Sequence, residues 1–278
     1  MKKFGKEFVQ RLIISLCIVG IVGTLLVFAY NGIIPFLVFF LVLMLGLFAN
    51  YEFINLVQKK AHINKWIALP SVIILIGSFF VTSYGQGYPL LPAVLLFPIA
   101  IAFFLTHFSK IDGAVTNISV SFFSIIYTAI PLGMILSIIY DDSLNYATDG
   151  RLWIIYLLII TKITDVAAYF IGKLFGKHKL AKVVSPNKTV EGSLGGFIVA
   201  IATSFLFHYL FPFQFSKADC FILGVILAVF SQIGDLVESL FKRDVKIKDS
   251  SSIPGIGGVL DMLDSIFINA PILYFYLS

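Results

Sequence analysis

Residues Ser231–Ser265 read SQIGDLVESLFKRDVKIKDSSSIPGIGGVLDMLDS. This stretch brings both kinds of charge together in an otherwise apolar part of the chain. It contains six acidic and four basic residues, together with a Pro-Gly-Ile-Gly-Gly turn. The sequence on both sides of it is almost entirely apolar. Charges among apolar residues are costly unless they are paired or bind a ligand. The stretch is therefore the first candidate for a functional site between two apolar helices.

The composition of the chain is that of an integral membrane protein. The 278 residues are 59% hydrophobic and 13% charged, with a mean hydropathy of +0.99. Soluble domains carry about 25% charged residues, so a soluble domain is excluded. The two cysteines, Cys17 and Cys220, lie in or beside apolar segments. Their spacing indicates neither a disulfide framework nor a metal site.

Apolar segments long enough to cross a bilayer recur along the chain. We predict nine of them, at 12–30, 33–54, 66–84, 88–106, 114–139, 152–172, 193–212, 218–239 and 259–277. The basic start resembles a signal peptide, but the first apolar run is too long for one and leads directly into the next. The predicted fold is an all-α polytopic membrane protein of about nine transmembrane helices. Its longest connections lie at 173–192 and 240–258.

The distribution of basic residues predicts the orientation. With the N-terminus in the cytoplasm, seventeen of the 20 lysines and arginines fall in cytoplasmic segments. Only Arg151 and Lys217 fall outside, and Lys162 lies within a predicted span. This bias follows the rule that cytoplasmic loops are enriched in basic residues. We therefore predict a C-terminus on the outer side and a polar site on the cytoplasmic face of a bacterial-type inner membrane.

Two pairs of carboxylates have helical spacing. Asp235 with Glu238, and Asp261 with Asp264, are each three residues apart and would share one side of a helix. Neighbouring carboxylates repel each other, and a bound divalent cation removes that repulsion. Mg²⁺ commonly binds one or two carboxylates together with substrate phosphates. The alternative is two pairs of solvated charges at helix ends.

Basic residues between these pairs suggest a phosphate ligand. Lys242, Arg243, Lys246 and Lys248 alternate with Asp244 and Asp249 in one short connection. Each cation alone could anchor the protein to anionic lipid headgroups. Cations beside a metal site are instead typical of sites that bind phosphates.

The earlier connection offers further polar residues. Residues 173–192 are glycine-containing and include Ser185, Lys188 and Thr189, and Thr189 is a candidate helix cap. The connection contains no P-loop sequence. Asp165 follows Lys162 by three residues, so it is either half of an internal ion pair or a member of the polar site.

Six short motifs resemble the signature of the phosphatidate cytidylyltransferases, also called CDP-diacylglycerol synthases. They are DxxAYxxGKxxGK at 165–177, SPxKTxEGxxGG at 185–196, SxxGDLxES at 231–239, KR at 242–243, KDS at 248–250 and PGxGGxLDxxDS at 254–265. The sequence departs from the family pattern at Ile256, where the family has His, and at Met262, where it has Arg. The segment between Asp249 and Pro254 is also one residue shorter than that pattern.

The resemblance implies that CTP and phosphatidate are converted to CDP-diacylglycerol and pyrophosphate, with Mg²⁺ and with a second metal ion or a monovalent cation left open. It places scaffold helices in residues 1–150 and the catalytic helices in 151–278. The expected metal ligands are Asp235, Asp261 and Asp264, and Lys248 and Asp249 join them as catalytic residues. The expected substrate-binding residues are Asp165, Lys173, Ser185, Lys188, Thr189, Glu191, Glu238, Lys242, Arg243, Gly257 and Gly258.

The resemblance also implies a homodimer in contact with membrane lipid, and we expect no nucleic-acid partner. Three alternatives remain at this point. The chain could be a CTP-dependent polyprenol or dolichol kinase-like enzyme, or a non-catalytic relative changed at Ile256 and Met262. It could also be a secondary transporter, although no inverted repeat is visible in the sequence.

Overall fold

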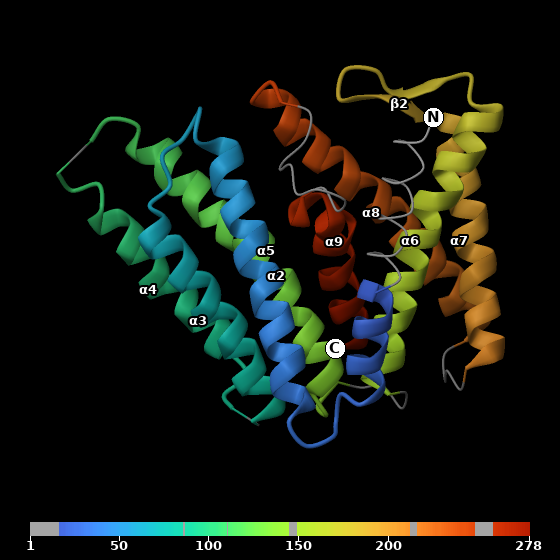
Figure 1. Ribbon diagram of the computed structural model, residues 1–278, viewed down its shortest axis with the longest axis horizontal. Helices are drawn as coiled ribbons and strands as arrows, with labels where there is room; N and C mark the ends of the chain where they lie inside the picture. Colours follow the sequence, from blue (N-terminus) through green and yellow to red (C-terminus); the bar gives the residue numbers. More distant parts are fainter. Residues whose placement is uncertain (1–16, 86, 110, 145–148, 212–215, 248–257) are drawn as a thin grey trace. The chain divides into compact units, whose positions relative to one another are not determined.

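The computed structural model describes residues 17–85, 87–109, 111–144, 149–211, 216–247 and 258–278, and these residues are predominantly helical (Figure 1). The labelled helices are α2 (Ile34–Val57), α3 (Lys65–Tyr84), α4 (Leu91–Leu105), α5 (Ala114–Tyr140), α6 (Gly150–Phe175), α7 (Val190–Leu210), α8 (Lys217–Asp244) and α9 (Val259–Leu277). The prediction of an all-α architecture is confirmed.

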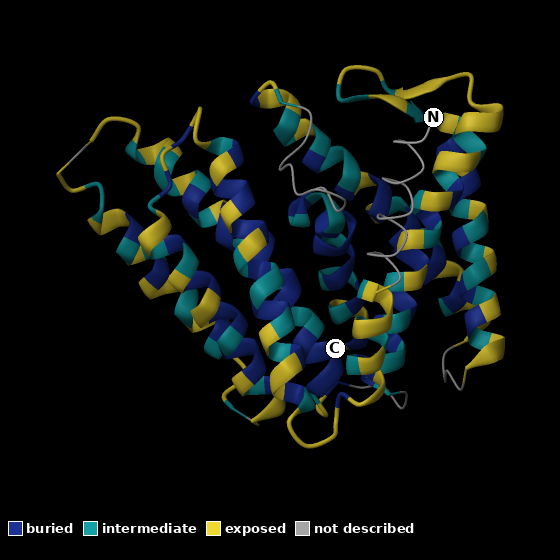
Figure 2. Ribbon diagram, in the orientation of Figure 1, coloured by how far each residue is buried: buried dark blue, intermediate teal, exposed yellow. Residues whose placement is uncertain are grey.

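In the part of the chain that the structure describes, seven helices are long and apolar enough to cross a membrane: α2, α3, α5, α6, α7, α8 and α9. Among the described residues, two of the nine predicted spans coincide with shorter apolar helices, Cys17–Val27 and α4. The chain is thus a polytopic membrane protein, and the count of nine stays a prediction. Helices α4 and α7 carry many exposed residues (Figure 2). Phe97, Ile101 and Ile198 are exposed apolar residues on these helices, which suits helices that face lipid.

Polar side chains fix the starts of several helices. Asn64 accepts a hydrogen bond from the Trp66 amide at the start of α3. Ser216 and Asp219 form a reciprocal capping box at the start of α8. Such caps supply acceptors for backbone amides that have no partner within the first helical turn. The predicted cap of α7 is confirmed, because the Thr189 hydroxyl accepts from the Gly192 amide at 3.2 Å.

The connection between α6 and α7 contains a β-hairpin that the sequence did not predict. Strands β1 (Lys179–Ala181) and β2 (Ser185–Thr189) pair antiparallel, with Lys179 opposite Thr189 and Ala181 opposite Ser185. The strands have three and five residues, and half of these residues are exposed. Segments this short contain too few residues for an alternating apolar pattern to be recognised.

The described residues form two compact units. The first contains the chain up to Leu136 and the start of α9 up to Met262, and the second contains Ser137 onward and α9 from Leu263. In the first unit, Phe53 packs near Tyr127, and the Asn50 amide donates to the Thr128 hydroxyl at 3.1 Å. Both Asn50 and Thr128 are fully buried, so this bond joins α2 to α5 in an apolar core.

In the second unit, α6 and α7 approach closely through small residues. A Cβ atom added to Gly192 would lie 2.5 Å from the Ala168 carbonyl oxygen and 2.9 Å from the Gly172 Cα. One turn later, a Cβ atom on Gly196 would lie 3.0 Å from the Thr164 carbonyl oxygen. Small residues four apart on facing helices allow this close packing between membrane helices. This close packing of α6 against α7 fixes where α7 begins. Because β2 ends directly before α7, the packing also fixes the end of the hairpin.

We predict that Gly192→Ala destabilises the protein by about 1–3 kcal/mol, because a methyl group there meets backbone atoms that cannot rotate away. Thermal unfolding of the purified protein in detergent measures the change. Gly77→Ala on α3 is the matched control, since a Cβ atom there has no neighbour within 4 Å. Equal stability of the two variants would contradict the packing described for α6 and α7.

Candidate active site

The site forms where α8 and α9 come into backbone contact. A Cβ atom on Gly234 would lie 2.7 Å from the Asp264 carbonyl oxygen and 2.8 Å from the Ser265 Cα. Only glycine permits this approach, because any side chain would collide with the backbone of α9. As a result, the residue after Gly234 on α8 lies beside Asp264 and Ser265 on α9.

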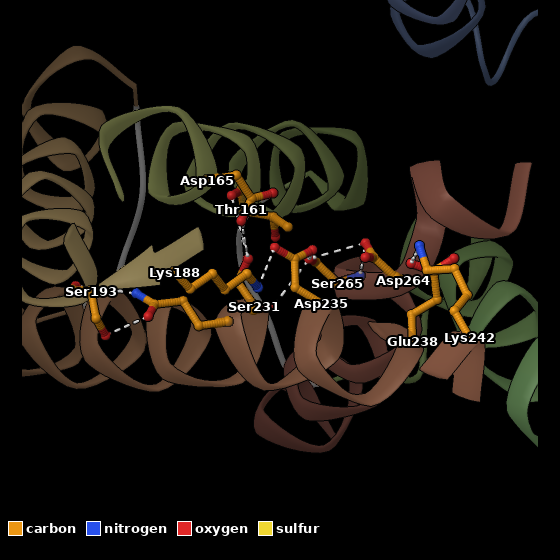
Figure 3. A network of polar contacts seen from close by, with 11 residues as sticks. Thr161, Asp165, Lys188, Ser193, Ser231, Asp235, Glu238, Lys242, Asp264 and Ser265 are labelled. Carbon is orange, nitrogen blue, oxygen red and sulfur yellow. Dashed lines mark hydrogen bonds and ion pairs between the residues drawn. The ribbon is translucent and has the colours of Figure 1, made fainter. Parts of the chain in front are cut away.

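Two carboxylates meet at the hydroxyl group of Ser265. Its Oγ lies 3.1 Å from Asp235 Oδ1 and 3.2 Å from Asp264 Oδ1 (Figure 3). Asp264 and Ser265 are buried, whereas the side chain of Asp235 retains 28% of its exposure. One hydroxyl proton cannot compensate two carboxylates, so this pair favours an additional positive charge.

Lys188 supplies one positive charge from the hairpin. Its Nζ lies 2.7 Å from Asp235 Oδ2, and the lysine side chain is 26% exposed. Lys188 is the next-to-last residue of β2, immediately before the Thr189 cap of α7. The hairpin therefore places a lysine beside a carboxylate on α8 that is more than forty residues further along the chain.

Asp165 on α6 joins the same polar network. The Ser231 hydroxyl, which is fully buried on α8, donates to Asp165 Oδ1 at 3.0 Å. Ser231 also presents its backbone carbonyl to the Ser265 hydroxyl at 3.1 Å. Figure 3 shows Asp165, Ser231, Asp235 and Ser265 as one connected set of side chains. Hydrogen bonds of this network thus join three helices, α6, α8 and α9.

A second connection joins α7 to α8. The Ser193 hydroxyl donates to the Gln232 side-chain oxygen, and the Gln232 amide donates back to the Ser193 carbonyl at 3.2 Å. Both residues are buried. Because a buried polar group is costly without a partner, this reciprocal pair specifies how α7 and α8 are rotated against each other.

At the end of α8, Lys242 and Glu238 form an ion pair one helical turn apart. Lys242 Nζ lies 2.7 Å from Glu238 Oε2, and their side chains are 13% and 3% exposed. The guanidinium of Arg243 donates to the Val184 carbonyl between the two strands of the hairpin and to the Ile247 carbonyl. Arg243 therefore also holds the hairpin turn to the end of α8.

Several predicted substrate-binding residues have structural partners in the connection between α6 and α7. The Glu191 carboxylate accepts from the backbone amides of Lys177 and His178 at 3.0 and 3.2 Å. It also contacts His178 Nδ1 at 2.5 Å. Ser185 pairs with Ala181 in the hairpin. These contacts indicate that Glu191 stabilises the conformation of the connection.

The remaining predicted residues lie elsewhere. Lys173 is exposed, and its Nζ lies 5.9 Å from the centre of the Tyr169 ring. Asp261 is in the first turn of α9, after the buried Gly258, and both belong to the first compact unit. Four residues of interest fall outside the described residues: Lys248, Asp249, Ile256 and Gly257.

The donor chemistry of the site suits a magnesium ion. No group of three or more His, Cys, Asp or Glu side chains in the described parts of the chain is placed to hold a metal by itself. Asp235 and Asp264 nevertheless supply hard carboxylate oxygens beside one hydroxyl. Because Mg²⁺ often takes only one or two protein carboxylates and completes its shell with water and phosphate oxygens, these residues fit it.

Sequence reasoning missed four contributors to this arrangement. Ser231 and Ser265 are the two ends of the segment 231–265, and their hydroxyl groups contact acidic residues on other helices, Asp165 and Asp235. Gln232 and Ser193 carried no distinguishing signal. Glu52 is a fifth such residue, and its signal is its position as an acidic residue in an apolar segment, which is by default a functional candidate. The structure places it in contact with α9.

Acidic and basic side chains gather where α6, α8 and α9 meet. The protein is therefore a polytopic membrane protein with a polar site of both charges. Comparison with known proteins makes this specific, because the cytidylyltransferase family matches residues 9–278. The phosphatidate cytidylyltransferase of Chlamydia pneumoniae is 32% identical, over 99% of this chain and 92% of that protein. That of Staphylococcus aureus (strain COL) is also 32% identical, over 87% of this chain and 95% of that protein.

The chain therefore belongs to the cytidylyltransferase family. A shorter match, to the phosphatidate cytidylyltransferase of Staphylococcus haemolyticus, reaches 44% identity over 46% of this chain and 50% of that protein. The resemblance found in the motifs between Asp165 and Ser265 is confirmed, as is the prediction of a nucleotidyltransferase. Membership also favours an enzyme over a secondary transporter.

A double-mutant cycle tests the pairing of Lys188 with Asp235. We expect Lys188→Met and Asp235→Asn to be non-additive in stability, with a coupling free energy of about 0.5–3 kcal/mol, because each substitution removes the same contact. Unfolding of the two single variants and the double variant in detergent gives this value.

The matched control combines Asp235→Asn with Lys182→Met, which removes an exposed lysine from the same hairpin. This pair should be additive within about 0.5 kcal/mol. Additivity of the Lys188 pair as well would show that the 2.7 Å contact contributes nothing to stability.

Proposed function

We propose that this chain transfers the cytidylyl group of CTP to phosphatidate and releases CDP-diacylglycerol and pyrophosphate. The observation that carries the proposal is the cluster of Asp235, Asp264 and Lys188 in a chain that matches phosphatidate cytidylyltransferases along nearly its whole length. A site with hard oxygen donors and a lysine suits a reaction between two polyanions.

The reaction needs charge neutralisation more than it needs a base. The phosphate of phosphatidate is a monoester whose second pKa is about 6, so at neutral pH it is already mostly a dianion. Its oxygen attacks the α-phosphorus of CTP, one new P–O bond forms, and the bond to the pyrophosphate leaving group breaks. Since no proton must be removed from the nucleophile, the catalytic problem is positioning and electrostatic stabilisation.

In this proposal, Asp235, Asp261 and Asp264 would hold Mg²⁺, which would supply positive charge at the phosphate oxygens. Support comes from the meeting of Asp235 and Asp264 at Ser265, and from the position of Asp261 three residues before Asp264 on α9. Lys248 and Asp249 would complete the catalytic group. A second metal ion or a monovalent cation would find its ligands among the same carboxylates.

The substrates would be bound by residues around this centre. Lys188, Lys242 and Arg243 bring positive charge toward it from the hairpin and from the end of α8. The further residues assigned to CTP or to the phosphatidate headgroup are Asp165, Lys173, Ser185, Thr189, Glu191, Glu238, Gly257 and Gly258. Scaffold helices in 1–150 and catalytic helices in 151–278 remain our functional division.

The proposal includes a membrane topology. Nine crossings with a cytoplasmic N-terminus and an outer C-terminus would place the site on the cytoplasmic face, where CTP is available. The support is that seventeen of the 20 basic residues then lie on the cytoplasmic side. Phosphatidate would enter sideways from that leaflet. The homodimer is proposed on family resemblance.

The decisive experiment follows pyrophosphate release from CTP by the purified protein in mixed micelles, with and without phosphatidate and Mg²⁺. We predict that release requires both, and that Asp261→Asn lowers its rate about a hundredfold or more, the scale expected when one preorganised electrostatic group is removed. If the Asp261→Asn variant remains folded in detergent, the loss of activity is a loss of catalysis and does not result from unfolding.

Asp142→Asn is the matched control, because it neutralises an exposed aspartate next to the end of α5. It should keep the full rate. Full activity of Asp261→Asn would overturn its assignment as a metal ligand. Turnover with a polyprenol in place of phosphatidate would instead favour the kinase-like alternative.

The topology is tested by fusing a reporter that is active only outside the cytoplasm to the C-terminus, after Ser278, and in parallel to residue 60. We expect activity from the C-terminal fusion and none from the fusion at Lys60, because Lys59, Lys60 and Lys65 mark a cytoplasmic connection. The opposite pattern, or equal activity from both, would contradict nine crossings in this orientation.

A further inference from the structure

Glu52 is a buried carboxylate on α2 that contacts the first turn of α9. Glu52 is only 6% exposed. Glu52 Oε1 accepts from the Val259 amide at 3.1 Å, and Oε2 accepts from the Leu260 amide at 2.8 Å. Both oxygens of one carboxylate are therefore used on consecutive backbone amides more than two hundred residues away in the sequence.

The residue that precedes the first turn of α9 has no side chain to cap the helix. The Gly258 carbonyl accepts from the Met262 amide, so Gly258 occupies the position that normally caps the helix. Glycine has no side chain that could accept hydrogen bonds from the first amides. A carboxylate satisfies two of these amides at once, and its negative charge is favourable at the positive end of the helix dipole.

The helix turn held by Glu52 carries the acidic motif of the proposed site. Asp261 directly follows Leu260, and Asp264 and Ser265 come one turn later on the same helix. Fixing two consecutive amides fixes both the residue at which α9 begins and the rotation of its first turn. The direction of the Asp261 side chain follows from that rotation.

We infer that Glu52 is a positioning residue for the proposed active site: it holds the first turn of α9 and thereby sets the direction of Asp261, one of the proposed metal ligands. Glu52 does not itself bind substrate or metal in this inference, because both of its oxygens are bonded to backbone amides. The inference rests on the proposed function for what the motif does, and on the two hydrogen bonds for what Glu52 does.

The first arm of the test measures hydrogen–deuterium exchange at Val259 and Leu260 in the full-length protein in detergent. In Glu52→Ala the exchange of these amides should rise about ten- to a hundredfold, the range that corresponds to losing a hydrogen bond to a charged group. Glu52→Gln keeps the shape and one acceptor oxygen, so its effect should be intermediate. It also serves if the alanine variant fails to fold.

The second arm measures cytidylyl transfer. Relative to wild type, kcat should fall about 10–100-fold in Glu52→Ala and the Mg²⁺ concentration for half-activation should rise, as expected when a group that orients metal ligands is lost. The KM for phosphatidate should change less than about twofold, because no substrate contact is removed. Glu52→Gln should recover part of kcat.

Asn50→Ala is the matched control, since Asn50 is fully buried on the same helix and its side chain bonds to Thr128 instead of α9. It should lower stability while leaving kcat and the exchange at Val259 and Leu260 unchanged. Unchanged exchange in Glu52→Ala, or a fall in activity equal to that of Asn50→Ala, would overturn the inference. An inactive wild type would refute the proposed function alone, because the exchange arm still decides whether Glu52 holds the turn.

Discussion

The cost of placing carboxylates among apolar helices governs the arrangement of the second compact unit. Asp235 is compensated by Lys188 and by the Ser265 hydroxyl, and Asp165 by the Ser231 hydroxyl. Each compensating group comes from a different element, so satisfying the carboxylates requires the hairpin, α6, α8 and α9 to meet at one place. Gly234 makes the meeting possible, because it lets α9 approach α8 at backbone distance. The polar site is thus also what specifies how these helices pack.

The sequence was sufficient to predict most of the helices, because a span of about twenty apolar residues leaves few alternatives in a membrane protein. It also predicted that Asp261 and Asp264 share one helix, since i,i+3 spacing is a local property. It could not predict which carboxylate meets which hydroxyl. The contact of Asp235 with Ser265 depends on how two helices are rotated against each other, and no local pattern encodes that rotation. The β-hairpin was missed because its strands are short and partly exposed.

The site combines groups held with different degrees of rigidity. Asp235, Asp264 and Ser265 are fixed on long helices that touch through their backbones. Lys188, by contrast, is carried on an exposed two-stranded hairpin, and Arg243 reaches that hairpin from the last turn of α8. This division would suit the proposed reaction between two polyanions, because carboxylates that held a metal would need fixed directions, whereas a lysine acts as a point charge on a flexible stem.

The position of the hairpin allows its turn to change independently of the packed helices. Its strands lie outside the membrane-spanning helices, and the turn between them is held by Arg243, which donates to the Val184 carbonyl. A substitution or a change of length between Ala181 and Ser185 therefore alters the surroundings of Lys188 without repacking any buried helix face. The turn is thus a place where the chain can change while the membrane scaffold stays the same.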